Sequence, residues 1–200
     1  MTVPSPRHPL EAVRDRGVVR SRDLAALGIS RNRLREFVAS GDLRRVARGV
    51  YVAADHDLTE KHSLAVACTL VPHGVVCLLS ALVFHGLTVH NPWEVWLAID
   101  PWARKPAQSS PSLRVVRFSG EALTHGVETH EVEGATVKVY SVAKTIADLF
   151  KYRNKVGLDV ALEALREAVR TRRATMDEVL LAAKVCRVKN VIRPYLEGLQ

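Results

Sequence analysis

The chain has 200 residues, 48% hydrophobic and 25% charged, which supports at least one packed core and excludes a largely disordered protein. No run of eighteen apolar residues occurs, and the N-terminal MTVPSPRHPL lacks the hydrophobic region and cleavage site of a signal peptide. We therefore expect a cytoplasmic protein that does not engage membranes. The three cysteines form no CxxC pair, which favours a reducing compartment over a disulfide framework.

The net charge of +8 is unevenly distributed. Residues 1–54 hold eleven arginines and five acids (+6), residues 55–150 hold seven basic residues and ten acids (−3), and residues 151–200 hold eleven basic residues and six acids (+5). Arginine without lysine favours forked recognition of phosphate and guanine, although a GC-rich genome biases composition the same way. The first segment is thus a candidate surface for an anionic partner.

The N-terminal sequence predicts three successive helices. LEAVRDRG indicates a first short helix, and Ser21 is a good N-cap for a second, RDLAAL, which ends at Gly28. The third helix has the clearest start, because Ser30 is a good N-cap and Ile29 and Leu34 are spaced as a hydrophobic staple.

The staple predicts which face of the third helix is apolar. Leu34, Phe37 and Val38 share that face, Arg33 and Arg35 lie on its two flanks, and Asn32, Glu36 and Ala39 lie opposite it. The segments DLRRV and VYVA then alternate in polarity around Ala47-Arg48-Gly49, as two strands joined by a tight turn do.

Three helices followed by a hairpin are typical of a winged helix-turn-helix, whose third helix can enter a major groove while the wing touches the backbone. Glu36 would repel a phosphate backbone unless it accepts from a cytosine or pairs with Arg33. The alternative interpretation is a solvated helical surface or a protein-protein module. The candidates for base readout are Ser30, Arg31, Asn32, Arg33 and Arg35; Arg44, Arg45 and Arg48 on the wing are candidates for phosphate contact, and Arg22 completes the DNA-binding set.

The remaining sequence predicts a second core that begins near residue 55. Thr59 is expected to cap the helix HSLAVACTLV, and Ser80 to cap SALVFHG. The segments EVWLAID, LRVVRFS, HEVEG and ATVKVY alternate as strands of a small antiparallel or mixed sheet.

The last third of the chain is expected to be helical. Ser141 caps VAKTIADLFKYR, an apolar stripe runs along LDVALEALREAVR, and Thr175 with Glu178 forms a capping box. A final helix around VIRPYLEGL is expected to be kinked or interrupted at Pro194. The expected fold is therefore α+β, with residues 1–54 as a winged helix-turn-helix and residues 55–200 as a mixed α+β domain.

The sequence assigns no metal, cofactor or catalytic residue. It contains no G-x-S-x-G, H-E-x-x-H or P-loop, and Asp100 with Lys105 lacks the second carboxylate of a nuclease site. Histidines and cysteines are frequent between positions 56 and 90, but their spacing fits no common zinc pattern. These residues are His56, His62, Cys68, His73, Cys77, His85 and His90.

A further polar set lies on the helix that follows Ser141. We expect Lys144, Asp148, Lys151 and Arg153 on its exposed side. Lys144 and Asp148 are four residues apart, however, a spacing that an ordinary helical ion pair also explains.

Two parts of the sequence resemble the AbiEi-type antitoxins, predicted transcriptional regulators of a viral defence system. In GVVRSRDLAALGISRNRLREFVASGDLRRVARGVYV, the Gly-Ile-Ser turn and the wing are similar to the family's N-terminal winged helix. Farther on, SALVFHGL, EVWLAI and YSVAKTIADLFKYRNKVGLDVALEALREAV follow in the family's order.

The resemblance implies an antitoxin whose winged helix binds inverted repeats in double-stranded DNA at its own promoter, and so represses its operon. It also implies that the second domain neutralises a nucleotidyltransferase-like toxin, directly or indirectly. The DNA-contacting role carries over to residues 30–35 and the wing arginines, and antitoxic function to the second domain, with the polar set above as candidates.

Two alternatives stay open. One is a stand-alone regulator whose second domain binds a ligand or a protein partner. The other is a metal-dependent nuclease, although the helical ending of the chain lacks the acidic motif of nuclease-like relatives. We therefore assign no enzyme activity.

Overall fold

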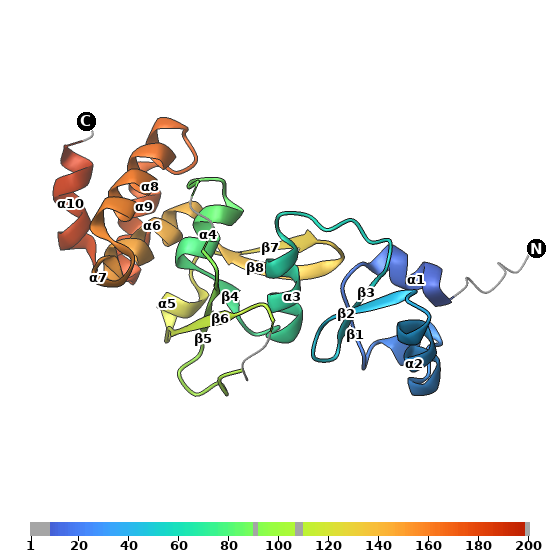
Figure 1. The fold of residues 1–200 in the computed structure, drawn as a ribbon. Coiled ribbons are helices and arrows are strands. Elements are labelled where there is room, and N and C mark those ends of the chain that lie inside the picture. The colour runs from blue at the N-terminus through green and yellow to red at the C-terminus, as the bar shows by residue number, and fades with distance from the viewer. Residues whose placement is uncertain (1–8, 90–91, 107–109, 199–200) are drawn as a thin grey trace, which may run out of the picture. The chain divides into compact units, whose positions relative to one another are not determined.

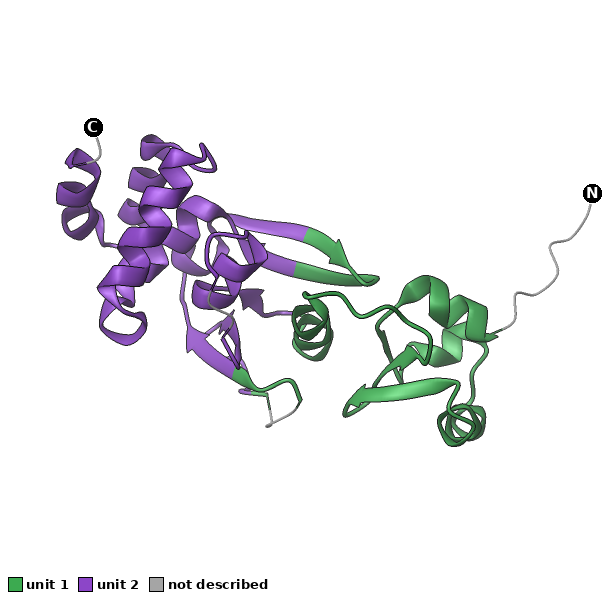
Figure 2. Cartoon of the chain, turned by 45° about the horizontal axis from the view of Figure 1, so that its top comes forward, with its two compact units in different colours: residues 1–72, 106–113, 130–137 green, residues 73–105, 114–129, 138–200 purple. Residues whose placement is uncertain are grey.

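The computed structural model describes residues 9–89, 92–106 and 110–198, and it has the expected α+β class (Figure 1). The chain divides into two compact units (Figure 2). The first comprises residues 1–72, 106–113 and 130–137, and the second comprises residues 73–105, 114–129 and 138–200. The boundary expected after residue 54 lies inside the first unit.

The first unit contains the predicted helices followed by a two-stranded wing. A short strand that the sequence did not predict, β1, extends the wing to three antiparallel strands in the order β1-β3-β2. The elements are α1 (Pro9–Arg16), β1 (Val19–Arg20), the 3-10 helix η1 (Leu24–Leu27), α2 (Arg31–Ala39), β2 (Leu43–Ala47), β3 (Val50–Ala53) and α3 (His62–Leu70).

The predicted second helix is shorter than expected, and Ser21 does not cap it. The backbone amide of Ser21 donates to the carbonyl of Gly49 at 2.8 Å, so the chain is still held against the wing at this point. The single turn η1 therefore starts only at Leu24. Gly28 ends it in the left-handed conformation, as predicted.

Two apolar clusters hold this unit together. One lies beneath the helices and contains Val13, Leu24 and Ile29, and the other joins the wing strands to α3. The second cluster includes Ala135, with Val132 packed against it, so the tip of a later hairpin belongs to this core.

Close backbone contacts attach this hairpin tip to the end of α1. Val18 donates from its amide to the carbonyl of Glu133 at 2.9 Å. Gly17 and Gly134 both have positive φ, and an added Cβ would lie 2.1 Å from the Glu133 oxygen and 1.6 Å from the Arg16 oxygen, respectively. Only glycine allows the two backbones to approach this closely.

The carboxylate of Glu133 fastens the segment before α3. It accepts hydrogen bonds from the amide and hydroxyl of Thr59 at 2.8 and 2.7 Å. It also contacts His62 Nδ1 at 2.6 Å and His56 Nε2 at 3.2 Å. The prediction that Thr59 caps α3 is wrong, because α3 begins only at His62, after Lys61; the Thr59 hydroxyl donates to Glu133 and accepts from the Lys61 amide at 3.2 Å.

The second unit is built on a five-stranded mixed sheet in the order β6-β5-β4-β8-β7. Strand β4 pairs antiparallel with β5 and parallel with β8. The strands are β4 (Val75–Val76), β5 (Val95–Ile99), β6 (Leu113–Arg117), β7 (Val127–Val132) and β8 (Ala135–Tyr140), and the helices are α4 (Leu78–Phe84), α5 (Glu121–Thr124), α6 (Val142–Lys151), α7 (Arg153–Val156), α8 (Leu158–Arg170), α9 (Met176–Val185) and α10 (Lys189–Glu197).

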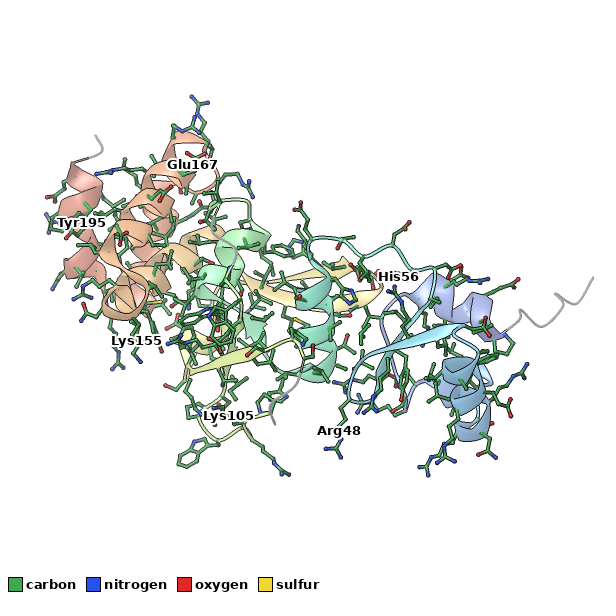
Figure 3. The ribbon with its side chains drawn as sticks, in the orientation of Figure 1. Arg48, His56, Lys105, Lys155, Glu167 and Tyr195 are labelled. Atoms are coloured by element: carbon green, nitrogen blue, oxygen red, sulfur yellow. The ribbon has the colours of Figure 1, made fainter. Side chains whose placement is uncertain are left out.

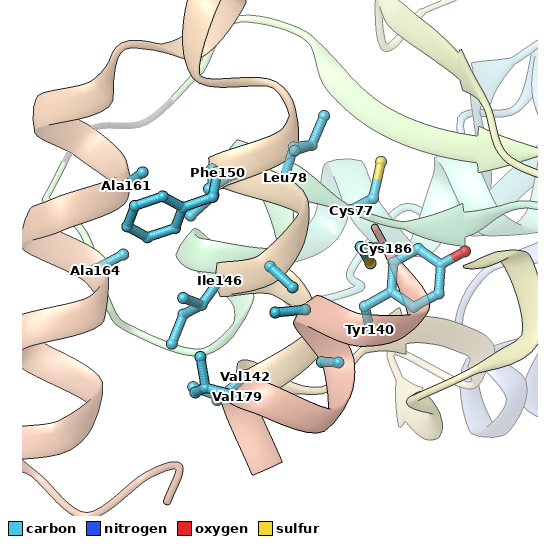
Figure 4. Close-up of a cluster of buried hydrophobic side chains, with 14 of the residues drawn as sticks. Cys77, Leu78, Tyr140, Val142, Ile146, Phe150, Ala161, Ala164, Val179 and Cys186 are labelled. Carbon is cyan, nitrogen blue, oxygen red and sulfur yellow. The ribbon is translucent and has the colours of Figure 1, made fainter. Parts of the chain in front are cut away.

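Helix α6 is the centre of the second core. All but one of its first nine residues are buried, and Phe150 faces Ala161 and Ala164 of α8 (Figure 4). The predicted cap by Ser141 and the capping box of Thr175 are both confirmed.

In this unit the predicted cap of α4 is wrong, and of the kink or interruption expected at Pro194 the interruption does not occur. Ser80 does not cap α4 but lies inside it, where its buried hydroxyl accepts from the Trp96 amide at 2.9 Å and so links the helix to β5. Pro194 does not interrupt α10, which continues to Glu197.

Candidate nucleic-acid interface

Helix α2 is joined to the first unit by a narrow apolar contact. Leu34 and Phe37 are only partly buried, and none of its nine residues is fully buried. Val38, which was expected on the same face, is 39% exposed. Most of the helix surface is therefore open, as in an element that enters a groove.

The start of α2 is fixed as the sequence predicted. The hydroxyl of Ser30 accepts a hydrogen bond from the Arg33 amide at 3.3 Å. Ile29 is buried, and Leu34 packs against the same cluster, which is the expected staple. These two contacts set the rotation of the helix and hence the direction of its arginines.

The charges of α2 do not stabilise the helix. Arg31 and Arg33 lie in its first turn, and the helix has no acid in that turn and no base in its last. A cation at a helix N-terminus opposes the macrodipole, at a cost of about 0.3–1 kcal/mol. A bound anion would offset this cost, which favours a binding role for these arginines.

The predicted readout residues Ser30, Arg31, Asn32, Arg33 and Arg35 are all exposed. The Arg33 guanidinium lies 5.5 Å from the centre of the Phe37 ring, a contact that restricts its rotamers. Glu36 is also exposed, and within the described part of the chain it forms no ion pair with Arg33.

The wing presents three further arginines. Arg44 donates to the His56 carbonyl at 3.4 Å, and Arg45 donates to the Ala47 carbonyl at 3.3 Å. Arg48 extends away from the ribbon at the turn between β2 and β3 (Figure 3). No described residue gives it a hydrogen bond or an ion pair, so it is available to a phosphate.

The start of α2 and the turn before η1 together line a shallow depression of about 320 Å³. Ser30, Arg31 and Arg22 lie on its rim, and Arg22 makes only a loose ion pair with Asp23, at 3.6 Å. Burial and then the charge of Arg22 lower the pKa of nearby Arg20, whereas Asp23 raises it. The depression therefore suits an anionic group such as a phosphate.

The polar set on α6 is not arranged as expected. Lys144 and Asp148 were predicted to be exposed, but their side chains are 0% and 1% exposed. They form the ion pair allowed by their spacing, with Lys144 Nζ 2.5 Å from the Asp148 carboxylate. A toxin cannot contact either group without unfolding this region.

Neighbouring side chains complete the environment of this pair. The Lys144 ammonium lies 4.0 Å from the centre of the Tyr140 ring and 4.7 Å from that of Phe118, so two aromatic faces help to replace its water. Cys186 donates to the other oxygen of Asp148 at 3.2 Å. Burial raises the pKa of Asp148 even though Lys144 lowers it.

The other two residues of the set reach the surface. Lys151 is exposed and lines a cavity of about 510 Å³. Lys184 and Arg187 share this cavity, and Glu121 is the one acid among the described residues that line it. Arg153 is half-buried and donates to the Phe150 carbonyl at 2.8 Å.

Several of the histidines and cysteines between positions 56 and 90 take part in packing and hydrogen bonding, whereas His73 is exposed. His56 and His62 contact the same oxygen of Glu133 at hydrogen-bond distances. His85 contacts the carbonyl of Tyr140 at 2.7 Å, and Cys68 and Cys77 are buried. His90 lies outside the described residues. Sequence reasoning missed Glu133, because a Glu-Gly pair after a strand indicates only a turn.

Comparison with known proteins identifies the N-terminal part of the chain. The model of a family described as "Transcriptional regulator, AbiEi antitoxin" matches residues 9–54. No curated protein matches the sequence significantly. None of the helices in the described ranges is long and apolar enough to cross a bilayer.

The matched residues contain the exposed helix α2 and its wing. The general role of the chain is thus that of an antitoxin and transcriptional regulator. Residues 9–54 are thus similar to the N-terminal domain of the AbiEi antitoxin family of transcriptional regulators.

Proposed function

We propose that residues 1–54 bind inverted repeats at the promoter of the protein's own operon and repress it, and that residues 55–200 counter a nucleotidyltransferase-like toxin. The observation that carries the first part is helix α2, which exposes arginines at its N-terminal half beside a basic wing. Such a helix can place guanidinium groups against guanine edges in the major groove.

The arginines have different roles in this proposal. Arg33 and Arg35 on α2 read base edges, whereas Arg44 and Arg48 on the wing hold phosphates. A lost bidentate contact with guanine costs roughly 1–3 kcal/mol at one base pair. A lost phosphate contact weakens binding to every sequence. It also makes the slope of log affinity against log salt concentration less negative by about 1.

A mobility-shift titration on the upstream repeat, with a shuffled duplex beside it, tests this division. Arg33→Ala and Arg35→Ala should reduce the preference for the repeat, and Arg44→Ala and Arg48→Ala should weaken both duplexes equally. Arg16→Ala, an exposed arginine on α1, is the matched control and should change neither. Unchanged affinity in all four variants would exclude the helix and wing as the DNA contact.

For the antitoxic part, the geometry separates surface residues from supporting ones. Lys151 can contact a partner from the rim of its cavity, whereas the buried pair of Lys144 and Asp148 keeps α6 and α9 in place through Cys186. We propose direct participation for Lys151 and Arg153, and a positioning role for the buried pair.

Co-expression with the neighbouring toxin gene tests this assignment. Lys151→Gln combined with Arg153→Gln should lose protection while the protein stays folded and still binds its repeat. Lys155→Gln on α7 is the matched control and should protect fully. Full protection by the double variant would show that these residues take no part. A harmless neighbouring gene would instead favour the stand-alone regulator.

A further inference from the structure

A tight turn after β5 holds one tryptophan almost completely in solvent. The turn runs from Asp100 to Ala103, whose amide donates to the Asp100 carbonyl at 3.1 Å. The Asp100 carboxylate also accepts from the Trp102 amide at 2.8 Å, and Pro101 restricts the backbone between them. Aspartate first and proline second are the preferred residues of a type I turn.

A side chain from the next strand fixes the same turn a second time. Arg117 Nη1 on β6 lies 2.7 Å from the carbonyl oxygens of Asp100, Pro101 and Ala103. Nη1 carries two hydrogens, so these are shared among the three carbonyl oxygens that converge on it. The turn is thus held by its own residues and by a neighbouring strand.

The side chain that this turn presents is exposed to an unusual degree. Trp102 is 94% exposed, whereas the Trp96 side chain on β5 is buried. An indole normally buries much of its surface in a folded protein. A rigid turn that keeps an indole in water loses this stabilisation, but it offers a preorganised flat surface to a ligand.

The charges beside the indole are positive. Arg104 and Lys105 follow it directly, and both are exposed and make no ion pair with any described residue (Figure 3 labels Lys105). The nearest acid in the sequence, Asp100, is already engaged by the turn. An aromatic face with adjacent cations suits a ligand that carries both a flat ring and a negative charge.

One indole offers roughly 200 Å² of contact, which suits a single stacked base, and the two cations suit the adjoining phosphates.

We propose that Trp102, Arg104 and Lys105 form a contact site for single-stranded nucleic acid, in which a base stacks on the indole and the cations bind its phosphates. The site lies in the second unit and goes beyond the duplex binding proposed for α2 and the wing. Arg117 is a positioning residue for it.

Fluorescence anisotropy of the full chain with a labelled single-stranded twelve-nucleotide probe tests the proposal. The Arg44→Ala/Arg48→Ala background removes the wing from the measurement. In that background Trp102→Ala should weaken binding about 5- to 150-fold, and Trp102→Phe should retain part of the affinity. Arg104→Gln and Lys105→Gln should each make the log-log salt slope less negative by about 0.7.

Trp93→Ala is the matched control, since Trp93 is 81% exposed and precedes the other end of β5. Trp93→Ala should leave binding of the probe unchanged. In a chain with no other substitution, Trp102→Ala should leave binding of the duplex repeat unchanged. Equal losses in Trp93→Ala and Trp102→Ala, or no loss in Trp102→Ala, would overturn the site. If Trp102→Ala bound the probe normally but no longer bound the toxin, the indole would belong to a protein interface. That result would also overturn the nucleic-acid site. Failure of duplex binding alone would instead refute the proposed function.

Discussion

Replacing Glu133 by glutamine should loosen the first unit and leave the second unchanged. The substitution keeps the shape of the side chain and an oxygen for Thr59, but it removes the negative charge that His62 and His56 contact. Burial by itself would raise the pKa of Glu133. Hydrogen bonds from His62 and Thr59 outweigh this effect and lower the pKa from 4.5 to about 2.

This pKa sets both the magnitude and the pH window of the effect. Each pKa unit corresponds to about 1.36 kcal/mol, so a fall from 4.5 to about 2 gives an upper bound of roughly 3 kcal/mol. The side chains of His56 and His62 are 15% and 19% exposed, so water screens part of their interaction with Glu133. We therefore expect Glu133→Gln to lower the stability of the first unit by about 2 kcal/mol. Because the folded-state pKa is depressed, this stability is present above pH 4.5 and is lost as the pH falls towards 2.

The positions of the tryptophans make the assay specific. All three, at positions 93, 96 and 102, lie in the second unit, so tryptophan fluorescence during urea unfolding follows that unit alone. Amide hydrogen exchange across residues 17–20 and 50–62 follows the first unit. Glu133→Gln should speed this exchange about 30-fold at pH 7, the equivalent of about 2 kcal/mol, and Glu131→Gln, an exposed neighbour, should not.

The same comparison at low pH can refute the reasoning. The difference between wild type and Glu133→Gln should shrink between pH 5 and pH 2, because the wild-type carboxylate is then protonated too. A difference that stays constant over this range would show that the glutamine acts through packing and that the charge contributes nothing.

Three other outcomes follow from the contacts described above. Lys144→Met leaves the buried Asp148 charge without its cationic partner and should destabilise the second unit by about 3–5 kcal/mol in tryptophan-monitored denaturation. Adding Asp148→Leu should restore much of that loss. Ser30→Ala removes the N-cap of α2, which should cost about 1 kcal/mol of stability and weaken DNA binding in a mobility-shift titration. Ser63→Ala, at an exposed serine on α3, is the control. All three cysteines are buried, and burial raises the pKa of Cys77. A thiol reagent should therefore react slowly with the protein until denaturant is added. Fast labelling of the native protein would contradict this packing.

Helix starts were predictable where a cap depends only on neighbouring residues. Ser30, Ser141 and Thr175 cap the helices that directly follow them, as expected. Ser80 and Thr59 have the same local signal, but their hydroxyls bond to Trp96 and Glu133, which lie 16 and 74 residues away. A cap prediction fails when a bond to a distant group helps to place the hydroxyl away from the first turn of the helix.

The candidate sites show the same limit. The arginines of α2 were predictable because a hydrophobic staple fixes the helix rotation within six residues. The burial of Lys144 was not, since an i,i+4 pair has the same sequence spacing on a surface and in a core. Its aromatic neighbours Phe118 and Tyr140 come from different parts of the chain.

The hairpin formed by β7 and β8 bears on how this protein could have evolved. Its tip, residues 130–137, is part of the first unit, although the chain reaches it only after building most of the second sheet. A recombination event that exchanged the DNA-binding end would therefore separate Gly134 from Arg16 and leave both surfaces without a match. The two halves are expected to be inherited together, and point substitutions, not truncations, are the appropriate way to separate their activities.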